Sequence, residues 1–200
     1  MEHFKNLSSF IAADGNIEKE VSTRIGMAAQ AYNKLQNVWK SSILSTSTKL
    51  KIYRSNVRSV LLYASETWRT NKKIESKLRG FEGRCLRRIL RVYWQDHISN
   101  LEVSRRTGIN SIVAEVKRRR WSWLGHVLRM DKRRLPHAAL RWTPPGKRGR
   151  GRPLGTWRRT VEEEMREAGK TWNELRWLAQ DRDAWRRFVS ALCSTRSAED

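Results

Sequence analysis

The chain has 200 residues, enough for one large domain or two small ones. Lysine and arginine number 42 against 20 aspartates and glutamates, so the formal net charge is +22. A chain of that charge repels itself unless a polyanion neutralises it; nucleic acid is the first candidate and an anionic membrane surface the second. Ten tryptophans exclude an intrinsically disordered chain, because disordered chains are poor in aromatic residues.

The positive charge is concentrated in the middle of the chain, where successive blocks of fifty residues carry +2, +8, +11 and +1. This asymmetry favours a binding zone over generic solubility. The start of the chain lacks a signal-peptide pattern, and no apolar run reaches the length of a membrane helix. The two cysteines suit a reducing compartment. We therefore expect a protein of the nucleus or cytoplasm, without a membrane partner.

The first half of the chain predicts a short strand pair followed by helices. Residues 4–13 alternate loosely and run into the turn signal ADGN. From there, apolar residues at steps of three and four predict three helices. Their stripes cover residues 17–39, 50–68 and 74–92.

The second half predicts two basic helices, a break and three further helices. A short helix over 100–107 and a longer one over 111–130 are separated by TGIN, a helix-turn-helix-like pair. All four prolines lie in residues 131–155, the clearest break in the chain. Beyond it, three stretches predict helices: TWRRTVEEEMREAG, a segment opened by the capping box TWNE, and DRDAWRRFVSAL.

The fold class is therefore mainly α: a helical bundle, then a basic helical region and a Gly/Arg/Pro-rich hinge. The predicted domains are, in chain order, a strand or hairpin remnant (1–15), a helical bundle (16–95), a basic helical region (96–141), the hinge (142–155) and C-terminal helices (156–200).

Catalytic and metal-binding patterns are weak. The acidic clusters are Glu162–Glu164 and Asp181 with Asp183; arginines at helical spacing and a helix start explain them better than metal binding does. Cys85 lies on an apolar stripe and predicts a core residue, and for His126 we slightly favour packing. No phosphate-binding glycine loop follows a strand. We expect no catalytic residue, metal, cofactor or small-molecule substrate.

Basic residues interleaved with aromatics are the strongest pattern. Arginines at helical spacing in RCLRRILR predict a basic ridge, and the run KRRR before Trp121 and Trp123 must expose at least two cations. We expect burial of these tryptophans over base stacking. The stretch RGRP resembles four residues of an AT-hook, though it also fits a flexible basic linker. The candidate nucleic-acid contacts are Arg84, Arg87, Arg88, Lys117, Arg118, Arg119, Lys147, Arg148, Arg150 and Arg152.

A resemblance to a known protein family extends over nearly the whole chain. Its most specific pieces are LLYASETW (61–68), RRRWSWLGHVLRM (118–130) and RGRPLGTW (150–157). The chain resembles the region that follows the catalytic palm in reverse transcriptases of non-LTR, LINE-like retrotransposons. The resemblance implies that residues 17–92 correspond to thumb helices that hold template and primer. It also implies that the later region helps to bind element RNA or target DNA.

Departures from that family bear on activity. The family's catalytic Tyr-x-Asp-Asp motif is missing, and no two consecutive aspartates occur anywhere. The sequence thus predicts a catalytically incomplete fragment that starts after the active site and binds RNA or DNA backbone. Two alternatives stay open: an independent helix-turn-helix DNA-binding regulator that uses SRRTGIN, and a decayed element without a selected function.

Overall fold

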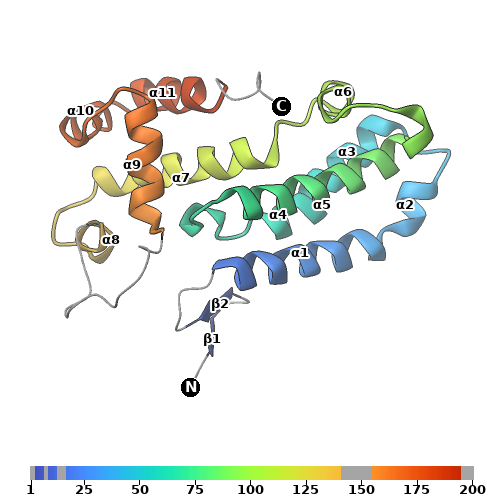
Figure 1. The fold of residues 1–200 in the computed structure, drawn as a ribbon, viewed down its shortest axis with the longest axis horizontal. Coiled ribbons are helices and arrows are strands. Elements are labelled where there is room, and N and C mark those ends of the chain that lie inside the picture. Colours follow the sequence, from blue (N-terminus) through green and yellow to red (C-terminus); the bar gives the residue numbers. More distant parts are fainter. Residues whose placement is uncertain (1–2, 7–8, 13–16, 141–154, 195–200) are drawn as a thin grey trace. The chain divides into compact units, whose positions relative to one another are not determined.

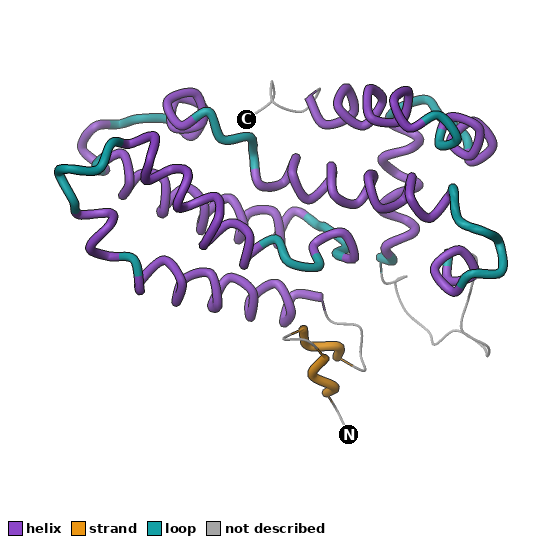
Figure 2. Tube along the Cα trace, turned by 180° about the vertical axis from the view of Figure 1, so that it is seen from behind, coloured by secondary structure: helices purple, strands orange, loops and turns teal. Residues whose placement is uncertain are grey.

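The computed structural model describes residues 3–6, 9–12, 17–140 and 155–194. It confirms the mainly α class, since helices make up most of the described chain (Figure 1, Figure 2). Two short strands, β1 (His3–Asn6) and β2 (Ser9–Ala12), pair antiparallel with His3 opposite Ala12. The described residues divide into two compact units: residues 3–65 with 71–116 (unit 1), and residues 66–70 with 117–194 (unit 2). The division runs through the predicted basic region 96–141, whose bounds stay a prediction.

Unit 1 contains the predicted bundle helices and the start of the basic region. Its helices are α1 (Ile17–Lys34), α2 (Gln36–Lys40), α3 (Thr46–Tyr53), α4 (Ser59–Leu61), α5 (Lys72–Leu90) and α6 (Asn100–Thr107), together with the first turn of α7 (Ile112–Leu128). Figure 1 shows α1 and α5 running in the same direction. The α3–α4 segment, which lies between them in the sequence, runs in the opposite direction. An ion pair from Lys73 to Glu18 joins the starts of α1 and α5.

The core of unit 1 is built from the stripes that the sequence predicts. On α5, Ile74, Leu78 and Ile89 are buried, and Asn71 caps the helix by accepting a bond from the Ile74 amide at 2.8 Å. On α1, Tyr32 stacks on Trp39 of α2 with ring centroids 4.8 Å apart. Apolar burial along these faces is the main stabilising term, because isolated helices of this length are marginal in water.

The predicted helix over 50–68 is corrected at its middle and end. A π-helical turn, η1 (Arg54–Arg58), lies between α3 and α4, and the helix stops at Leu61. Ser55 Oγ and Asn56 Nδ2 donate to backbone carbonyls one turn earlier, and such bonds compete with the regular helix. A π-turn adds a residue, so Leu61 takes the buried position that the α-helical stripe predicts for Val60.

Unit 2 contains most of α7 and four further helices. These are α8 (Leu135–Ala139), α9 (Trp157–Glu167), α10 (Trp172–Leu178) and α11 (Arg182–Ser194). The predicted capping box is confirmed: Thr171 and Glu174 bond each other's backbone amides at the start of α10. Asp181 likewise accepts from two amides in the first turn of α11, as expected for an acid at a helix start.

An aromatic core holds unit 2 together. Trp121 is fully buried, as predicted, and its ring centroid lies 5.9 Å from that of Trp185 and 5.5 Å from that of Phe188. The helices come close enough that a methyl group added at Gly125 would lie 2.2 Å from Trp185 Nε1. Glycine at residue 125 is therefore what lets the Trp185 indole reach α7, where Nε1 donates to the Trp121 carbonyl.

Candidate nucleic-acid interface

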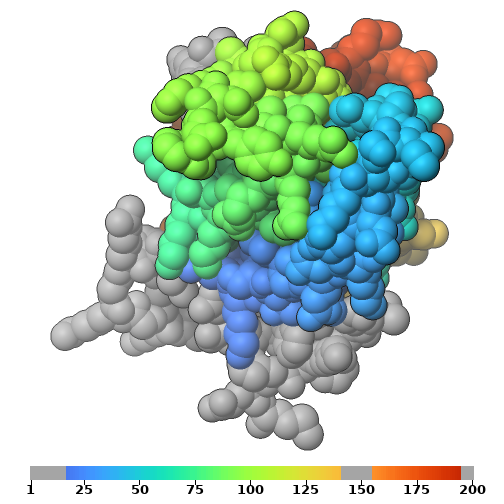
Figure 3. All heavy atoms as spheres, turned by 90° about the vertical axis from the view of Figure 1, so that its right-hand side faces the viewer, coloured from blue at the N-terminus to red at the C-terminus, as the bar shows by residue number. Residues whose placement is uncertain are grey.

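The last turns of α5 carry the basic ridge that the sequence predicts. Arg84 and Arg88 are exposed and Arg87 is half-buried. Arg88 donates to Gln36 Oε1 at 2.9 Å, and Arg91 donates to the carbonyls of Lys40 and Ser41. Figure 3 shows this end of unit 1, where α2, the end of α5 and α6 gather on one face. Arg88 and Arg91 thus lie beside α2, whereas Arg87 contacts the start of α6.

These arginines keep their positive charge uncompensated. Among the described residues, Arg87, Arg88 and Arg91 donate only to neutral carbonyl and amide oxygens. A neutral acceptor orients a guanidinium without cancelling its field, and the remaining N–H groups can still bind phosphate in the bidentate geometry that arginine favours. The ridge is therefore oriented and still electrostatically available.

Arg87 also has a structural role. Its Nη2 donates to the Ile98 carbonyl at 3.1 Å and to Asn100 Oδ1 at 2.8 Å, and Asn100 is the first residue of α6. The side chain thereby ties the start of α6 to α5. Of the three α5 candidates, Arg87 is consequently the one with the least freedom to turn toward a ligand.

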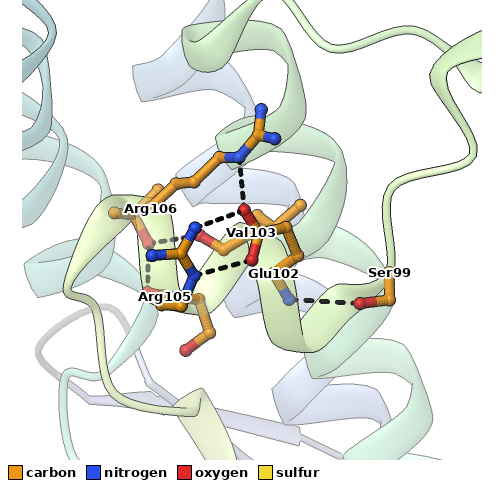
Figure 4. Close-up of polar contacts among 7 residues, drawn as sticks. Ser99, Glu102, Val103, Arg105 and Arg106 are labelled. Carbon is orange, nitrogen blue, oxygen red and sulfur yellow. Dashed lines mark hydrogen bonds and ion pairs between the residues drawn. The ribbon is translucent and has the colours of Figure 1, made fainter.

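The arginines of α6 differ from those of α5, because both form ion pairs with one carboxylate (Figure 4). Glu102 accepts from Arg105 Nε at 2.7 Å and Nη2 at 2.8 Å, and from Arg106 Nε at 2.7 Å. The Ser99 hydroxyl caps the helix by accepting from the Glu102 amide. Hydrogen bonds from Arg105 and Arg106 lower the pKa of Glu102 to about 2. Both arginines of the SRRTGIN segment are thus already ion-paired.

The KRRR run of α7 divides between surface and core. Arg118 is exposed and Arg119 half-buried, whereas Lys117 is 8% exposed and Arg120 is completely buried. The prediction that at least two of these cations point outward holds for Arg118 and, in part, Arg119. Lys117, a predicted contact, lies largely out of reach of solvent in this structure.

Arg120 belongs to a buried network that the sequence reasoning missed. It donates to Glu164 Oε1 at 2.5 Å and to the Trp68 carbonyl at 2.9 Å, and Glu164 Oε2 accepts from Trp121 Nε1 at 2.6 Å. The residues of this network come from α7, α9 and the segment 66–70 of unit 2. The sequence signal for this network is a glutamate on the apolar face of α9: Glu164 lies three residues after Val161 and one before Met165.

The acidic clusters are used structurally, as predicted. Glu162 pairs with Arg158 one turn earlier on α9, and Glu164 pairs with Arg120. Cys85 is buried in the core, and burial raises the pKa of its thiol to about 12, which disfavours the reactive thiolate. Within the described ranges, no group of three His, Cys, Asp or Glu side chains could hold a metal ion. The expected packing of His126 is wrong: this side chain is exposed on α7.

The hinge candidates Lys147, Arg148, Arg150 and Arg152 lie outside the described residues. The chain is described again from Gly155, whose carbonyl accepts a bond from Arg69. Trp157, the first residue of α9, donates from Nε1 to the Glu66 carbonyl at 2.8 Å, and its ring meets that of Trp123 edge-on at 5.4 Å. Trp157, two residues after the predicted hinge 142–155, is thus anchored inside unit 2.

Comparisons with known proteins point to mobile DNA. A family model described as a domain of unknown function (DUF6451) matches residues 31–63, from the end of α1 past α4. The chain is also similar to an uncharacterised transposon-derived protein of Caenorhabditis elegans, with 26% identity over 195 residues, covering 92% of this chain and 69% of that protein. No solved structure matches. The likeness along nearly the whole chain supports a transposable-element origin.

None of the described helices combines sufficient length with sufficient apolar character to cross a bilayer.

Proposed function

We propose that this protein is a nucleic-acid-binding part of a non-LTR retrotransposon reverse transcriptase, without the catalytic palm motif. It binds the phosphate backbone of RNA or DNA, as template–primer or target, through basic helices and the basic hinge. It acts by binding and not by polymerisation, because the chain lacks the paired aspartates that hold a polymerase's metals. The transposon-derived relative supports the element origin.

The observation that carries the proposal is the uncompensated ridge on α5. Arg88 and Arg91 are held in place by neutral oxygens, while several acids of unit 1 are occupied by ion pairs of their own. A positive surface that stays oriented without an internal counter-ion fits an external polyanion. Phosphate groups of nucleic acid supply that charge at regular spacing.

The helix-turn-helix alternative is less favoured by the residues at the start of α7. In that class the first turns of the second helix reach the base edges. Here Ile112 and Val116 are buried, and the first exposed cation on α7 is Arg118, in its second turn. On α6, Arg105 and Arg106 are both ion-paired with Glu102. Backbone binding without strong sequence preference therefore fits better than base-specific reading.

A salt titration tests the proposal. The purified chain is titrated with labelled single-stranded RNA and duplex DNA over a range of salt concentrations, with binding followed by fluorescence anisotropy. We expect the logarithm of the affinity for duplex DNA to fall by roughly 0.9 per tenfold rise in salt for each phosphate neutralised. Binding that is absent at low salt, or independent of salt, would contradict the proposal.

A pair of double variants separates the ridge from net charge. Arg84→Gln with Arg88→Gln removes two cations of the ridge, and Arg176→Gln with Arg182→Gln removes two exposed cations of unit 2. We expect the first variant to flatten the duplex salt slope by roughly 1.8 and the second to change it little. Equal slopes for both variants would mean that net charge alone governs binding, without a ridge.

A further inference from the structure

Two large aromatic side chains are exposed directly after the basic ridge. Tyr93 is 68% exposed and Trp94 is 80% exposed, in the loop that joins α5 to α6. Most other tryptophans of the described chain are buried or half-buried. Single exposed apolar residues are ordinary on protein surfaces. Two adjacent exposed aromatic rings, however, form an apolar surface on which a flat ring system can stack.

The loop that carries these rings is held at both ends. At its start, Arg91 adopts a left-handed conformation with φ 56°, and the Val92 amide donates to the Arg87 carbonyl at 2.9 Å. At its end, the Arg87 guanidinium donates a hydrogen bond to the Ile98 carbonyl. Arg87 therefore bonds to both ends of the loop, through its backbone carbonyl at the start and through its side chain at the end.

The turn that contains the rings is closed by a reciprocal pair of bonds. The Tyr93 amide donates to Asp96 Oδ2 at 2.6 Å, and the Asp96 amide donates back to the Tyr93 carbonyl at 3.1 Å. The short helical turn η3 (Trp94–Asp96) lies between them. A segment ordered in this way loses little conformational entropy when it binds, so the exposed rings are pre-organised.

The charge around the rings favours an anionic ligand. Residues 84–106 contain six arginines and two acids, Asp96 and Glu102. Glu102 is occupied by two arginines of α6, and Asp96 accepts the Tyr93 amide. Arg88 and Arg91 donate only to neutral oxygens in the part of the chain that is described. Their fields are therefore free to act on a ligand at the loop.

We propose that Tyr93 and Trp94 form a stacking platform for unpaired bases of a single-stranded nucleic acid, with Arg88 and Arg91 binding the adjacent phosphates. This inference rests on the proposed function and names its ligand. Base stacking on aromatic side chains next to a cationic groove is how single strands are bound with little sequence preference. Bases of a duplex are already stacked on one another, so the platform discriminates against duplex.

The test compares Trp94→Ala with Trp177→Ala. Trp177 lies on α10 of unit 2 and is 81% exposed, so it matches Trp94 in residue type and exposure. Affinities are measured for oligo-rU and oligo-dT of roughly 12 nucleotides, a length within the usual site size, and for a duplex of the same length. Thermal unfolding of each variant checks that the fold is retained.

We expect Trp94→Ala to weaken single-strand binding by roughly tenfold, since one stacked base contributes about 1–3 kcal/mol and 1.4 kcal/mol corresponds to tenfold. Duplex binding should change by less than about twofold, because duplex bases are not available to the platform. Trp94→Phe should retain most of the affinity, and Trp177→Ala should retain all of it.

Several results would overturn the platform. If Trp94→Ala binds single strands as the wild type does, the platform is wrong, while a salt-dependent wild-type affinity leaves the proposed function intact. An equal loss for single strand and duplex, or for Trp94→Ala and Trp177→Ala, would also overturn it. Absence of any nucleic-acid binding at low salt would reject both the platform and the function on which it rests.

Discussion

Units 1 and 2 each contain a buried arginine–glutamate pair, and the two pairs differ in completeness. In unit 2, both oxygens of the Glu164 carboxylate are bonded, one to Arg120 and one to Trp121 Nε1, and Arg120 has no exposed surface. In unit 1, the Glu82 carboxylate lies 3.0 Å from Arg58 Nε and accepts the Ile112 amide, while the Arg58 side chain keeps 12% of its surface in water.

The difference shows what a buried charge needs. A buried ion pair gains only when its remaining donors and acceptors are also bonded, since desolvation of both charges opposes it. Glu164 meets this condition more fully than Glu82, and burial raises the pKa of the Glu82 carboxyl. Unit 2 thus buries its pair almost completely, while the Arg58 side chain of unit 1 keeps part of its surface in water. The following experiments compare the two units, from the largest expected effect to the smallest.

The largest effect is expected for Glu164→Ala. It leaves Arg120 charged, fully buried and without its carboxylate, and it removes the acceptor of Trp121 Nε1. We expect a loss of about 3–5 kcal/mol in the free energy of unfolding, measured by urea denaturation. The double variant Arg120→Met with Glu164→Met should recover most of that loss, because no unpaired charge remains. If the single variant unfolds as easily as the wild type, the pair is not buried as described.

The second effect compares two helical glycines, one in each unit. Gly125→Ala places a methyl group 2.2 Å from Trp185 Nε1, so we expect a loss of about 1–3 kcal/mol from overpacking. At Gly80 on α5 the nearest atom is 3.5 Å away, in the flexible side chain of Arg84. Gly80→Ala should therefore stabilise the protein by up to about 1 kcal/mol through helix propensity. Thermal unfolding measures the change in stability of each variant. A gain in stability for both variants would contradict the close approach of α7 and Trp185 in unit 2.

A smaller effect is expected for Glu82→Gln. The amide oxygen can still accept a hydrogen bond from the Ile112 amide, and Arg58 keeps its hydrogen bond to the Asn110 carbonyl. We expect a smaller loss in the free energy of unfolding than for Glu164→Ala, because the uncharged amide avoids the desolvation cost of the Glu82 carboxylate. Urea denaturation under the same conditions gives the comparison. A loss as large as that of Glu164→Ala would mean that the two pairs are equivalent.

The smallest effect concerns pH. Burial raises the pKa of Glu82 above its ordinary value of 4.5, so the folded state binds a proton more tightly than the unfolded state does. Stability contributed by Glu82 therefore falls as the pH rises from 4.5 through its folded pKa. As the pH rises above 4.5, the wild type should therefore lose stability relative to Glu82→Gln.

Glu102→Gln provides the matched control for this pH effect. The pKa of Glu102 is lowered to about 2, so the stability that Glu102 contributes is complete above pH 4.5 and is lost only as the pH falls toward 2. The difference between the wild type and Glu102→Gln should be constant from pH 5 to pH 7. A Glu82→Gln difference that is equally constant would show that Glu82 titrates normally.

Local rules predicted the helices well. The stripe over 74–92, the short helix 100–107 and the capping box at Thr171 are present because periodicity and caps act within one or two turns. The same rules missed the π-turn at Arg54–Arg58, where serine and asparagine side chains compete for backbone carbonyls. For the candidate interface, spacing predicted the ridge of Arg84 and Arg88 on α5 but not its anchoring by α2.

Burial of individual cations could not be read from spacing. Four consecutive basic residues surround a helix, so nothing local says that Lys117 and Arg120 turn inward while Arg118 stays in water. The partner of Arg120 lies 44 residues away in the sequence, and that of Arg58 lies 24 residues away. These choices depend on which carboxylate the fold brings near, and that is a long-range property.

The sequence alone determined the mainly helical class, the helix starts and the central excess of positive charge, because propensity, capping and composition are local quantities. Only the tertiary structure decided which charges find a partner far along the chain. It paired Arg120 with Glu164 and Arg58 with Glu82, and it left Arg88 bonded to a neutral amide. Coulomb energy depends on the separation of groups in space, and chain folding sets that separation.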